Sequence, residues 1–431
     1  MRLIVSLLIV LSTIPSFAQL PADPTGSVMT GGLGMTYVDG KPYFLFNTAP
    51  ELSFGPWGLG LDLNLRISPD GNIREEDWDE GYDFIRIIRY VRYAQKRAPL
   101  YVRVGQLTSA RLGRGLLMYN YSNGISYDDR KIGLEFDMRF DKWGFETVSS
   151  NVIGADIWGG RAYFMPLAET GIPFLSSLET GATFIMDMNE DGRKLNDGGI
   201  ITDNQFTEAN PVTALAFDAG LPLLDNDFID FGIYTEFGQF AGYGSGGSMG
   251  LETNLKGLGS FLAISAKLEH RINGDQFIAN YFGPFYEVER LTRLSDTLYT
   301  TKLQALKDTK NPGNGLYGGL TTTILGTLQI LGSYEETYRI KNSGLLHLGT
   351  DLGDMIPSVL ARADYYKRGL SAGSSVFSLD DRSLLTAELG YKPYPFMVVS
   401  MFYQWTFVPE GDGDYKAVSK VEPKVSFVFR F

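Results

Sequence analysis

Apolar side chains recur at every second position in many segments of this chain. The pattern is clearest in the last eleven residues, where one alternating set is mostly apolar and the other mostly polar: Val421, Pro423, Val425, Phe427, Phe429 and Phe431 against Glu422, Lys424, Ser426, Val428 and Arg430. Successive side chains of a β-strand point to opposite faces. The segment is therefore predicted to be a strand with one apolar face. Comparable runs of about 10 residues begin at Trp57, Ile132, Leu262, Leu385 and Met397.

The second face of these strands carries charges, such as Asp62, Arg66 and Glu135. Beyond the amino-terminal segment, no stretch reaches the roughly 18 apolar residues of a spanning helix. A chain that enters lipid without such helices must pair its backbone groups between strands, as a closed barrel does. We therefore predict an all-β fold, a transmembrane antiparallel up-and-down β-barrel of about 18 strands, within a range of roughly 16 to 22. A soluble all-β protein is the alternative, but it gives no reason for charges along the middle of such strands.

The amino terminus has the pattern of a secretory signal. A basic start at Arg2 precedes the apolar run Leu3 to Leu11, and the small residues Ser16 and Ala18 precede the expected cleavage site. We predict a signal peptide over residues 1–18, a short periplasmic lead over 19–28 and one barrel domain over 29–431. A membrane anchor is the alternative, although the apolar run is too short to span a bilayer.

A terminal amphipathic strand that ends in Phe431 resembles the closing strand of bacterial outer-membrane β-barrel proteins. The resemblance covers the mature chain at the level of the class and matches no subfamily. It implies the cell outer membrane of a Gram-negative bacterium, with outer-membrane lipid as the surroundings. It also implies that Phe427, Phe429 and Phe431 form a signal for the barrel-assembly machinery. A homo-oligomer or other envelope proteins remain open as further partners.

Charge and composition exclude several functional classes. The chain has 38 basic and 50 acidic residues, a formal net charge of −12, so nucleic acid is not an expected partner. It has no Cys, which excludes disulfides and thiolate metal sites. The two histidines, His270 and His347, give little support for a transition-metal site.

A group of arginines provides the first candidate site. Charge at the lipid face of a barrel is costly, so these side chains should face the lumen. The pore-lining candidates are Arg86, Arg92, Arg103, Arg111, Arg114 and Arg139 with the acids Glu135 and Asp137. Arg111 and Arg114 lie in a Gly-rich stretch that could fold inward. Opposed charges at the waist of a pore orient polar solutes and set ion selectivity. A lumen closed by salt bridges is the equally weighted alternative.

Two further motifs are weaker. Asp187, Asn189 and Asp191 fit the opening of a calcium loop, which makes Ca²⁺ a possible ligand, but Gly198 stands where an EF-hand has its bidentate Glu. An acidic hairpin loop is the other interpretation. Ser122 lies in a Ser-Asn-Gly stretch that resembles part of the motif of outer-membrane phospholipases, yet Asn120 stands where the activating His would be. We therefore expect no enzyme and no catalytic residues.

The sequence as a whole favours a porin-like passive channel for small polar solutes or ions, with a lumen lined by arginine and acids. The alternative is a non-conducting outer-membrane scaffold, a docking protein or a secretion-system component that uses long acidic extracellular loops. One segment, Gln276 to Arg290, is ambiguous, because it could hold two short strands or a loop.

Overall fold

The computed structural model describes residues 27–38, 41–78, 84–85, 87–96, 98–124, 131–154, 156–172, 174–190, 211–256, 259, 261–293, 299–371, 375–380, 382–411 and 414–430. The predicted signal peptide and nearly all of the predicted lead lie outside the described residues. So do three of the candidate residues, Arg86, Asp191 and Phe431.

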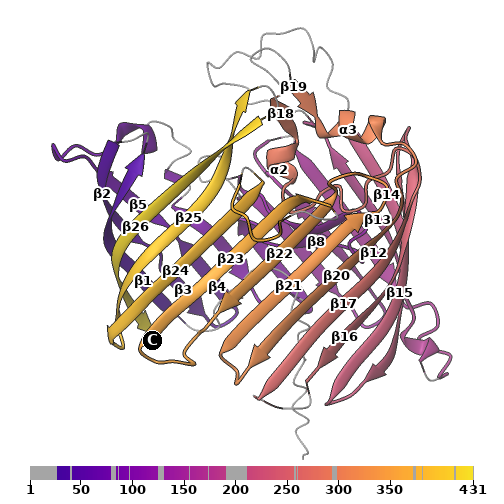
Figure 1. Ribbon diagram of the computed structural model, residues 1–431. Coiled ribbons are helices and arrows are strands. Elements are labelled where there is room, and N and C mark those ends of the chain that lie inside the picture. Colours follow the sequence, from indigo (N-terminus) through magenta and orange to yellow (C-terminus); the bar gives the residue numbers. More distant parts are fainter. Residues whose placement is uncertain are drawn as a thin grey trace, which may run out of the picture.

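The described part of the chain is almost entirely β-structure (Figure 1). Its strands are β1 (Val28–Val38), β2 (Lys41–Thr48), β3 (Glu51–Phe54), β4 (Trp57–Leu61), β5 (Leu63–Ile67), β6 (Ile88–Tyr93), β7 (Leu100–Gly105), β8 (Ala110–Leu112), β9 (Met118–Tyr121), β10 (Gly133–Arg139), β11 (Trp143–Ser149), β12 (Ile157–Phe164), β13 (Glu179–Asp187), β14 (Val212–Asp225), β15 (Ile229–Phe240), β16 (Ser245–Leu255), β17 (Leu262–Asn273), β18 (Leu291–Arg293), β19 (Tyr299–Thr301), β20 (Gly313–Ile324), β21 (Leu328–Thr337), β22 (Gly344–Asp351), β23 (Val359–Leu370), β24 (Ser383–Tyr394), β25 (Met397–Gly411) and β26 (Asp414–Arg430). The short helices are η1 (Glu75–Asp77), η2 (Leu175–Ser177), α2 (Tyr286–Glu289) and α3 (Lys302–Asp308).

Twenty-two of these strands form one antiparallel sheet. Strands that follow one another in this sheet pair with each other. In addition, β3 continues β2 and β5 continues β4, so that β2 pairs with β5 and β3 pairs with β4. The last strand, β26, pairs with the first, β1, over Val28–Gly34, and the circuit of hydrogen bonds returns to its start. The predicted fold class, an antiparallel up-and-down barrel, is confirmed. The strands β8 and β9 form a separate hairpin, and β18 and β19 form another.

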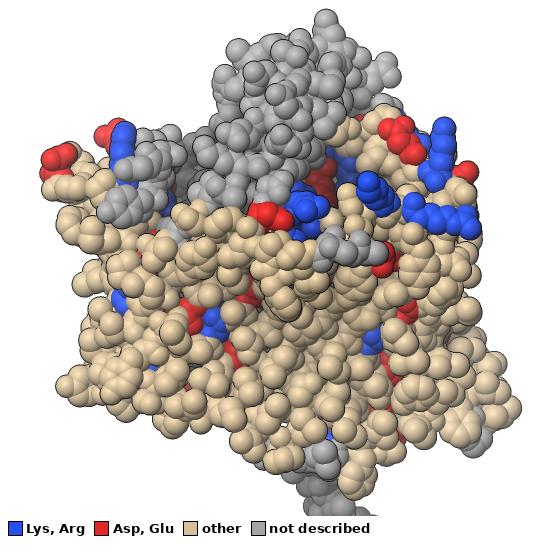
Figure 2. All heavy atoms as spheres, viewed as in Figure 1, with Lys and Arg blue, Asp and Glu red and all other residues tan. Residues whose placement is uncertain are grey.

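The period-two pattern divides each strand into an outer and an inner row. On β15, Ile233 and Phe237 are 44% and 48% exposed, whereas Tyr234 and Glu236 between them are buried. The outer row is largely aliphatic and aromatic, and Figure 2 shows a broad band of uncharged residues around the visible face, with most charges above it. Burying such a face in lipid is favourable, and the inner row can remain polar. None of the described helices is long and apolar enough to span a membrane.

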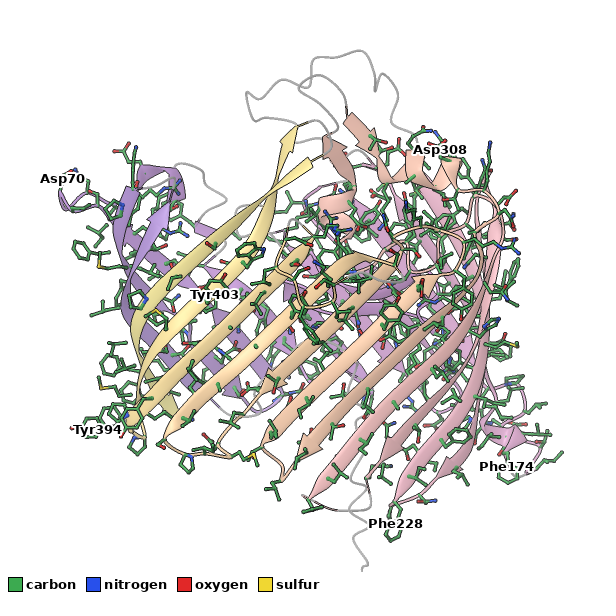
Figure 3. All side chains as sticks on the ribbon, viewed as in Figure 1. Asp70, Phe174, Phe228, Asp308, Tyr394 and Tyr403 are labelled. Carbon is green, nitrogen blue, oxygen red and sulfur yellow. The ribbon has the colours of Figure 1, made fainter. Side chains whose placement is uncertain are left out.

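The two ends of the barrel differ. At the end that we call the turn end, connections such as 55–56, 140–142 and 395–396 are short, and the carboxy terminus lies there (Figure 1). The opposite end, the loop end, carries longer connections, including 106–132 and 274–312. Figure 3 labels Phe228 and Tyr394 at the turn end and Asp70 and Asp308 at the loop end.

Exposed aromatic side chains mark the turn end. Trp143 stacks on Phe140 with ring centroids 4.1 Å apart, and Tyr394 stacks on Phe396 at 5.6 Å. Trp57 and Phe228 are also exposed at this end. Aromatic rings favour the lipid–water interface because the ring is apolar and the NH or OH group can reach water. The turn end therefore has one of the two aromatic girdles of a membrane barrel.

Two loop-end connections fold back into the barrel and form its apolar core. The hairpin β8–β9 and the segment 274–308 contribute Leu112, Leu116, Phe277, Phe282 and Leu306 to a cluster of fully buried side chains. This cluster packs against inner residues of β11–β15, namely Val148, Ile157, Ile185, Val212, Ala214, Ala216 and Phe240. The ambiguous segment Gln276 to Arg290 is thus an infolded loop with α2, and the described part of it contains no strand. Along β11–β15, the inner wall of the barrel is therefore covered by these infolded segments.

Candidate functional site

The hairpin β8–β9 occupies part of the lumen, and its turn is held against the wall. Gly113 and Gly115 in this turn have positive φ angles of 63° and 98°. A Cβ atom on Gly113 would lie 2.8 Å from Oε1 of Glu236, so a larger residue would push the turn away from the wall. The amide of Leu116 donates to Oε2 of Glu236 over 2.8 Å. The tip of the hairpin is therefore held by the side chain of Glu236 on β15.

Arg111 and Arg114, predicted to reach inward, lie on this hairpin. Arg114 is 3.1 Å from Glu179 and 3.4 Å from Asp218, and Arg111 is 3.7 Å from Glu252. On the wall, Arg161 of β12 contacts the same acids, at 2.6 Å from Asp218 and 2.8 Å from Glu179. Two arginines thus share two carboxylates, one arginine from the hairpin and one from the barrel.

A second group of wall charges continues this network. Lys267 of β17 donates to the carbonyl oxygen of Arg114 over 2.7 Å and lies 3.2 Å from Glu269. Arg271 pairs with Glu269 at 2.6 Å and with Glu335 at 2.8 Å. We call the inner wall of β10–β17 and β20, with the hairpin and residues 274–293 and 299–308 against it, the packed sector.

The remaining predicted pore-lining residues that the structure describes lie on β6, β7 and β10. Arg92 and Arg103 are buried, and their guanidinium groups donate to the carbonyl oxygens of Ala94 at 2.5 Å and Gln106 at 2.9 Å. Arg103 also lies 4.0 Å from the centre of the Tyr90 ring. These two arginines make local wall contacts.

Of the two predicted acids, Glu135 lies opposite Arg103 in the strand register, and both acids have further neighbours. The carboxylate of Glu135 pairs with Lys96 and accepts a hydrogen bond from Tyr101 at 3.2 Å. Asp137 follows Glu135 in the inner row, opposite Glu146 of β11. Arg139 ends the row as an exposed residue at the turn end. The structure thus brings Arg111 and Arg114 together with Glu252, Glu179 and Asp218, and it places Glu135 beside Lys96.

The segment that contains α2 is held by a buried charge cluster at the loop end. Arg290 pairs with Asp187 at 2.7 Å and with Asp156 at 3.3 Å, and Tyr286 donates to Asp187 over 2.5 Å. Lys131 bridges Asp156 at 2.9 Å and Glu287 at 2.7 Å. The carboxylate of Asp187, the first residue of the possible calcium motif, is therefore engaged by Arg290 and Tyr286. Asn189 donates its amide to Asp156 over 2.8 Å. Among the described residues, no group of three or more His, Cys, Asp or Glu side chains could hold a metal ion.

Asp156 in this cluster gives a pH prediction. Burial alone would raise the pKa of its carboxyl, but Lys131 and Arg290 lower the pKa from 3.8 to about 2. Because the folded-state pKa is depressed, the stabilisation is present above pH 4 and is lost as the pH falls through 2. It amounts to about 2 kcal/mol. The midpoint temperature of thermal unfolding of the purified protein should therefore fall more steeply between pH 6 and pH 2 for the natural chain than for Asp156→Asn. Parallel curves would contradict this assignment.

Along β22–β26 several charges of the inner wall remain accessible, although Glu388 and His347 among them are buried; we call this wall the open sector. The side chain of Arg362 is 48% exposed, that of Asp364 is 33% and that of Lys424 is 29%. In the packed sector, Arg161 is 3% exposed and Arg271 is 5%. Both sets face inward, so the difference reflects what lies against each wall.

Three strands bring the charges of the open sector together. Glu388 of β24 is buried between Arg362 of β23 at 2.5 Å and Lys424 of β26 at 3.2 Å, and it accepts a hydrogen bond from Ser400 at 2.7 Å. His347 lies 2.7 Å from Asp364 and stacks on Tyr366. A cavity with a volume of about 210 Å³ lies here, lined by Asp351, Arg362, Asp364, Thr386, Glu388 and Phe402 among others. No pairing of these residues is predicted from the sequence, because their contacts depend on the register between neighbouring strands.

The other residues singled out in the sequence have structural surroundings. Ser122 is buried, and its hydroxyl accepts a hydrogen bond from the amide of Gly124 at 3.3 Å. His270 lies on the outer face of β17, away from the lumen. Phe427 and Phe429 of β26 lie in the outer row and are exposed, with Phe429 stacked on Phe396.

The antiparallel barrel, with an apolar outer row and a polar inner row on its strands, has the fold of bacterial outer-membrane β-barrel proteins. No protein-family model matches the chain, and no curated protein sequence matches it. Solved structures with a similar fold include CdiB from Acinetobacter baumannii, at 8% identity and a TM-score of 0.29, where 94% of this chain covers 60% of that one. They also include Wzi from Escherichia coli, at 12% identity and a TM-score of 0.35, covering 94% of this chain and 85% of that one. OccK5 (OpdH) of Pseudomonas aeruginosa has 11% identity and a TM-score of 0.34, covering 97% and 100%. The assignment of the fold depends on the strand pairings and exposed faces described above.

Proposed function

We propose that this protein is a passive channel of the Gram-negative outer membrane that conducts small polar solutes or ions along the open sector. The observation that carries the proposal is the accessibility of Arg362, Asp364 and Lys424 beside a packed sector with closely similar chemistry. Charges inside a barrel that were needed only for packing would be covered, as Arg161 and Asp218 are.

The arrangement of charge in the open sector suits selective conduction. Arg362 and Lys424 flank one buried acid, whereas Asp351 and Asp364 line the same cavity. Opposite charges across a narrow passage produce a transverse field that orients polar solutes, and the balance of charge sets ion selectivity. A pore with this lining should pass ions of both signs, with a preference that depends on individual residues.

The test is the conductance of purified protein in a planar bilayer. Natural protein should give stepwise currents. In Arg362→Glu, one positive charge in the passage becomes negative, so the reversal potential in a salt gradient should move toward cation selectivity, with a several-fold change in the permeability ratio. Lys142→Glu is the matched control, because Lys142 is an exposed cation at the turn end that pairs with Glu169.

The alternative function is a non-conducting scaffold, docking protein or secretion component, which uses the long loop-end connections. Silence of the natural protein across a wide voltage range would favour it and would end the channel proposal. Stepwise conduction with an unchanged reversal potential in Arg362→Glu would mean that solutes do not pass along the open sector.

Localisation can be tested separately from conduction. We propose that the outer-row aromatics of β26 direct assembly, together with the terminal Phe431. Removal of Phe431 should leave less folded protein in the outer-membrane fraction and more unfolded protein in the periplasm, measured by fractionation and immunoblotting. Removing the exposed turn residues 69–72 at the opposite end is a control that should not change fractionation.

A further inference from the structure

The outer wall has a groove that the channel proposal does not use. It crosses the lipid-facing side of β14–β17 and β20 and has a volume of about 760 Å³. Its floor and sides include Ala219, Ile233, Met249, Leu268, Leu316 and Tyr338. Ala219 is the smallest side chain of these six, beside larger outer-row neighbours, and gives the groove part of its depth. Tyr338 places one end of the groove at the loop end of the barrel.

Cations gather directly beyond that end. Lys310, Arg339 and Lys341 are exposed residues of the two loop-end connections that flank β20 and β21, and we call them the rim patch. Arg339 donates to Oδ1 of Asn311 over 2.5 Å, which places it beside Lys310. Figure 2 shows blue side chains gathered at the loop end on the right of the view, where Figure 3 labels Asp308 of α3.

The rim patch is available to a ligand. Within the described part of the chain, none of its three cations forms an ion pair with a carboxylate. The nearest acids in sequence have other partners, since Asp308 accepts hydrogen bonds from the Gln304 side chain at 3.0 Å and Asp275 accepts one from the Asn311 amide at 2.5 Å. Three accessible cations are thus gathered at one point of the rim, with Asp275 and Asp308 close by.

We propose that the rim patch and the groove together bind one anionic lipid, a phosphorylated glycolipid of the outer leaflet with lipid A chemistry. Its phosphates would contact Lys310, Arg339 and Lys341, and an acyl chain would lie in the groove beneath Tyr338. The two parts match the two ends of such a molecule, because the cations are at the rim and the apolar groove is at membrane depth. The proposal rests on the proposed outer-membrane location with the loop end facing outward, since the longer connections of such barrels are extracellular, but not on conduction.

The test is native mass spectrometry of the intact protein in neutral detergent, titrated with lipid A. Natural protein should retain one lipid. The triple variant Lys310→Gln, Arg339→Gln, Lys341→Gln should bind roughly a hundredfold more weakly, since each cation near an anionic surface contributes a factor of about five. Ala219→Phe, which fills the groove and leaves every charge in place, should also reduce retention. Lys392→Gln, at the opposite end, should not.

Three outcomes would overturn the proposal. The first is equal retention in all variants, and the second is equal retention of zwitterionic phosphatidylethanolamine and lipid A by the natural protein. The third is loss of lipid A retention in the charge variant but no loss in Ala219→Phe, because binding would then need only a phosphate group and not the groove. Unchanged thermal unfolding of each variant shows that the barrel has folded. Conductance measured on the same samples separates a failure of this site from a failure of the channel.

Discussion

Replacement of residues 109–121 by a short Gly-Ser linker should raise the single-channel conductance several-fold. These residues form the hairpin β8–β9, which fills the packed sector with Leu112, Leu116 and Leu117. Barrels of about 16 to 18 strands already leave an aqueous channel, and larger barrels are closed by a plug inside the lumen. Removal of the hairpin would join the packed sector to the open one, so that conductance rises with the enlarged cross-section.

The base of the hairpin should survive this deletion. The side chain of Asn123 accepts a hydrogen bond from the backbone amide of Leu107 at 2.7 Å. It also donates one to the carbonyl oxygen of Ser150 at 2.9 Å, so the flanking chain remains held to the wall. Leu112→Asp is a milder variant that places an unpaired charge in the apolar contact, and it should give partial opening seen as extra current levels. Deletion of the exposed turn 69–72 is the control. An unchanged conductance after removal of a folded hairpin would show that the packed sector is not next to the conducting path.

The barrel could be predicted from the sequence because the outer face imposes a strict condition. Lipid contact requires an apolar residue at every second position, and runs such as Leu262 to Leu268 satisfy it. The pattern also assigns the inner row, and Glu135 and Arg103 both lie there, as neighbours in register. A strand count is less secure, since breaks such as Asp62 divide one strand into β4 and β5.

The infolded segments could not be predicted in the same way. The segment from Gln276 to Arg290 is rich in aromatic residues, which also suit strands, yet Phe277, Tyr281, Phe282 and Tyr286 pack against one another inside the barrel. Their burial comes from contact with the wall, which alternation does not reveal. A signal was present in the hairpin, because an apolar run from Leu116 to Met118 is unusual for an exposed loop.

The open sector shows a second limit. Arg362, Glu388 and Lys424 meet because β23, β24, β25 and β26 are in a particular register, with Arg362 opposite Glu388 and Ser400 opposite Lys424. Each residue alone is an unremarkable inner-row charge. Their accessibility also depends on which wall the infolded segments cover, and no local pattern encodes that choice.

Arg290→Met should destabilise the infolded segment by about 3–5 kcal/mol, the usual cost of removing one partner from a buried ion pair. Arg290 is buried and contacts Asp187 at 2.7 Å and Asp156 at 3.3 Å, and methionine would leave the wholly buried Asp187 without its cation. Hydrogen exchange should therefore accelerate through residues 277–290, while the amides of β23–β25 keep their protection. Lys142→Met, at an exposed pair, should cost no more than about 1 kcal/mol.

A double variant distinguishes two causes of the destabilisation: the lost attraction between Arg290 and Asp187, and the buried charge of Asp187 that is left without a partner. Asp187→Asn combined with Arg290→Met removes both the cation and the carboxylate that depends on it, whereas Asp156 retains Lys131. If the cost of Arg290→Met is mainly an uncompensated buried charge, the double variant should regain most of the lost exchange protection. If protection instead falls further in the double variant, the segment is held by the hydrogen bonds of Asp187, including that from Tyr286, rather than by charge balance. The same samples in a bilayer would then show whether release of this segment changes the current, which links the stability of the packed sector directly to the width of the passage.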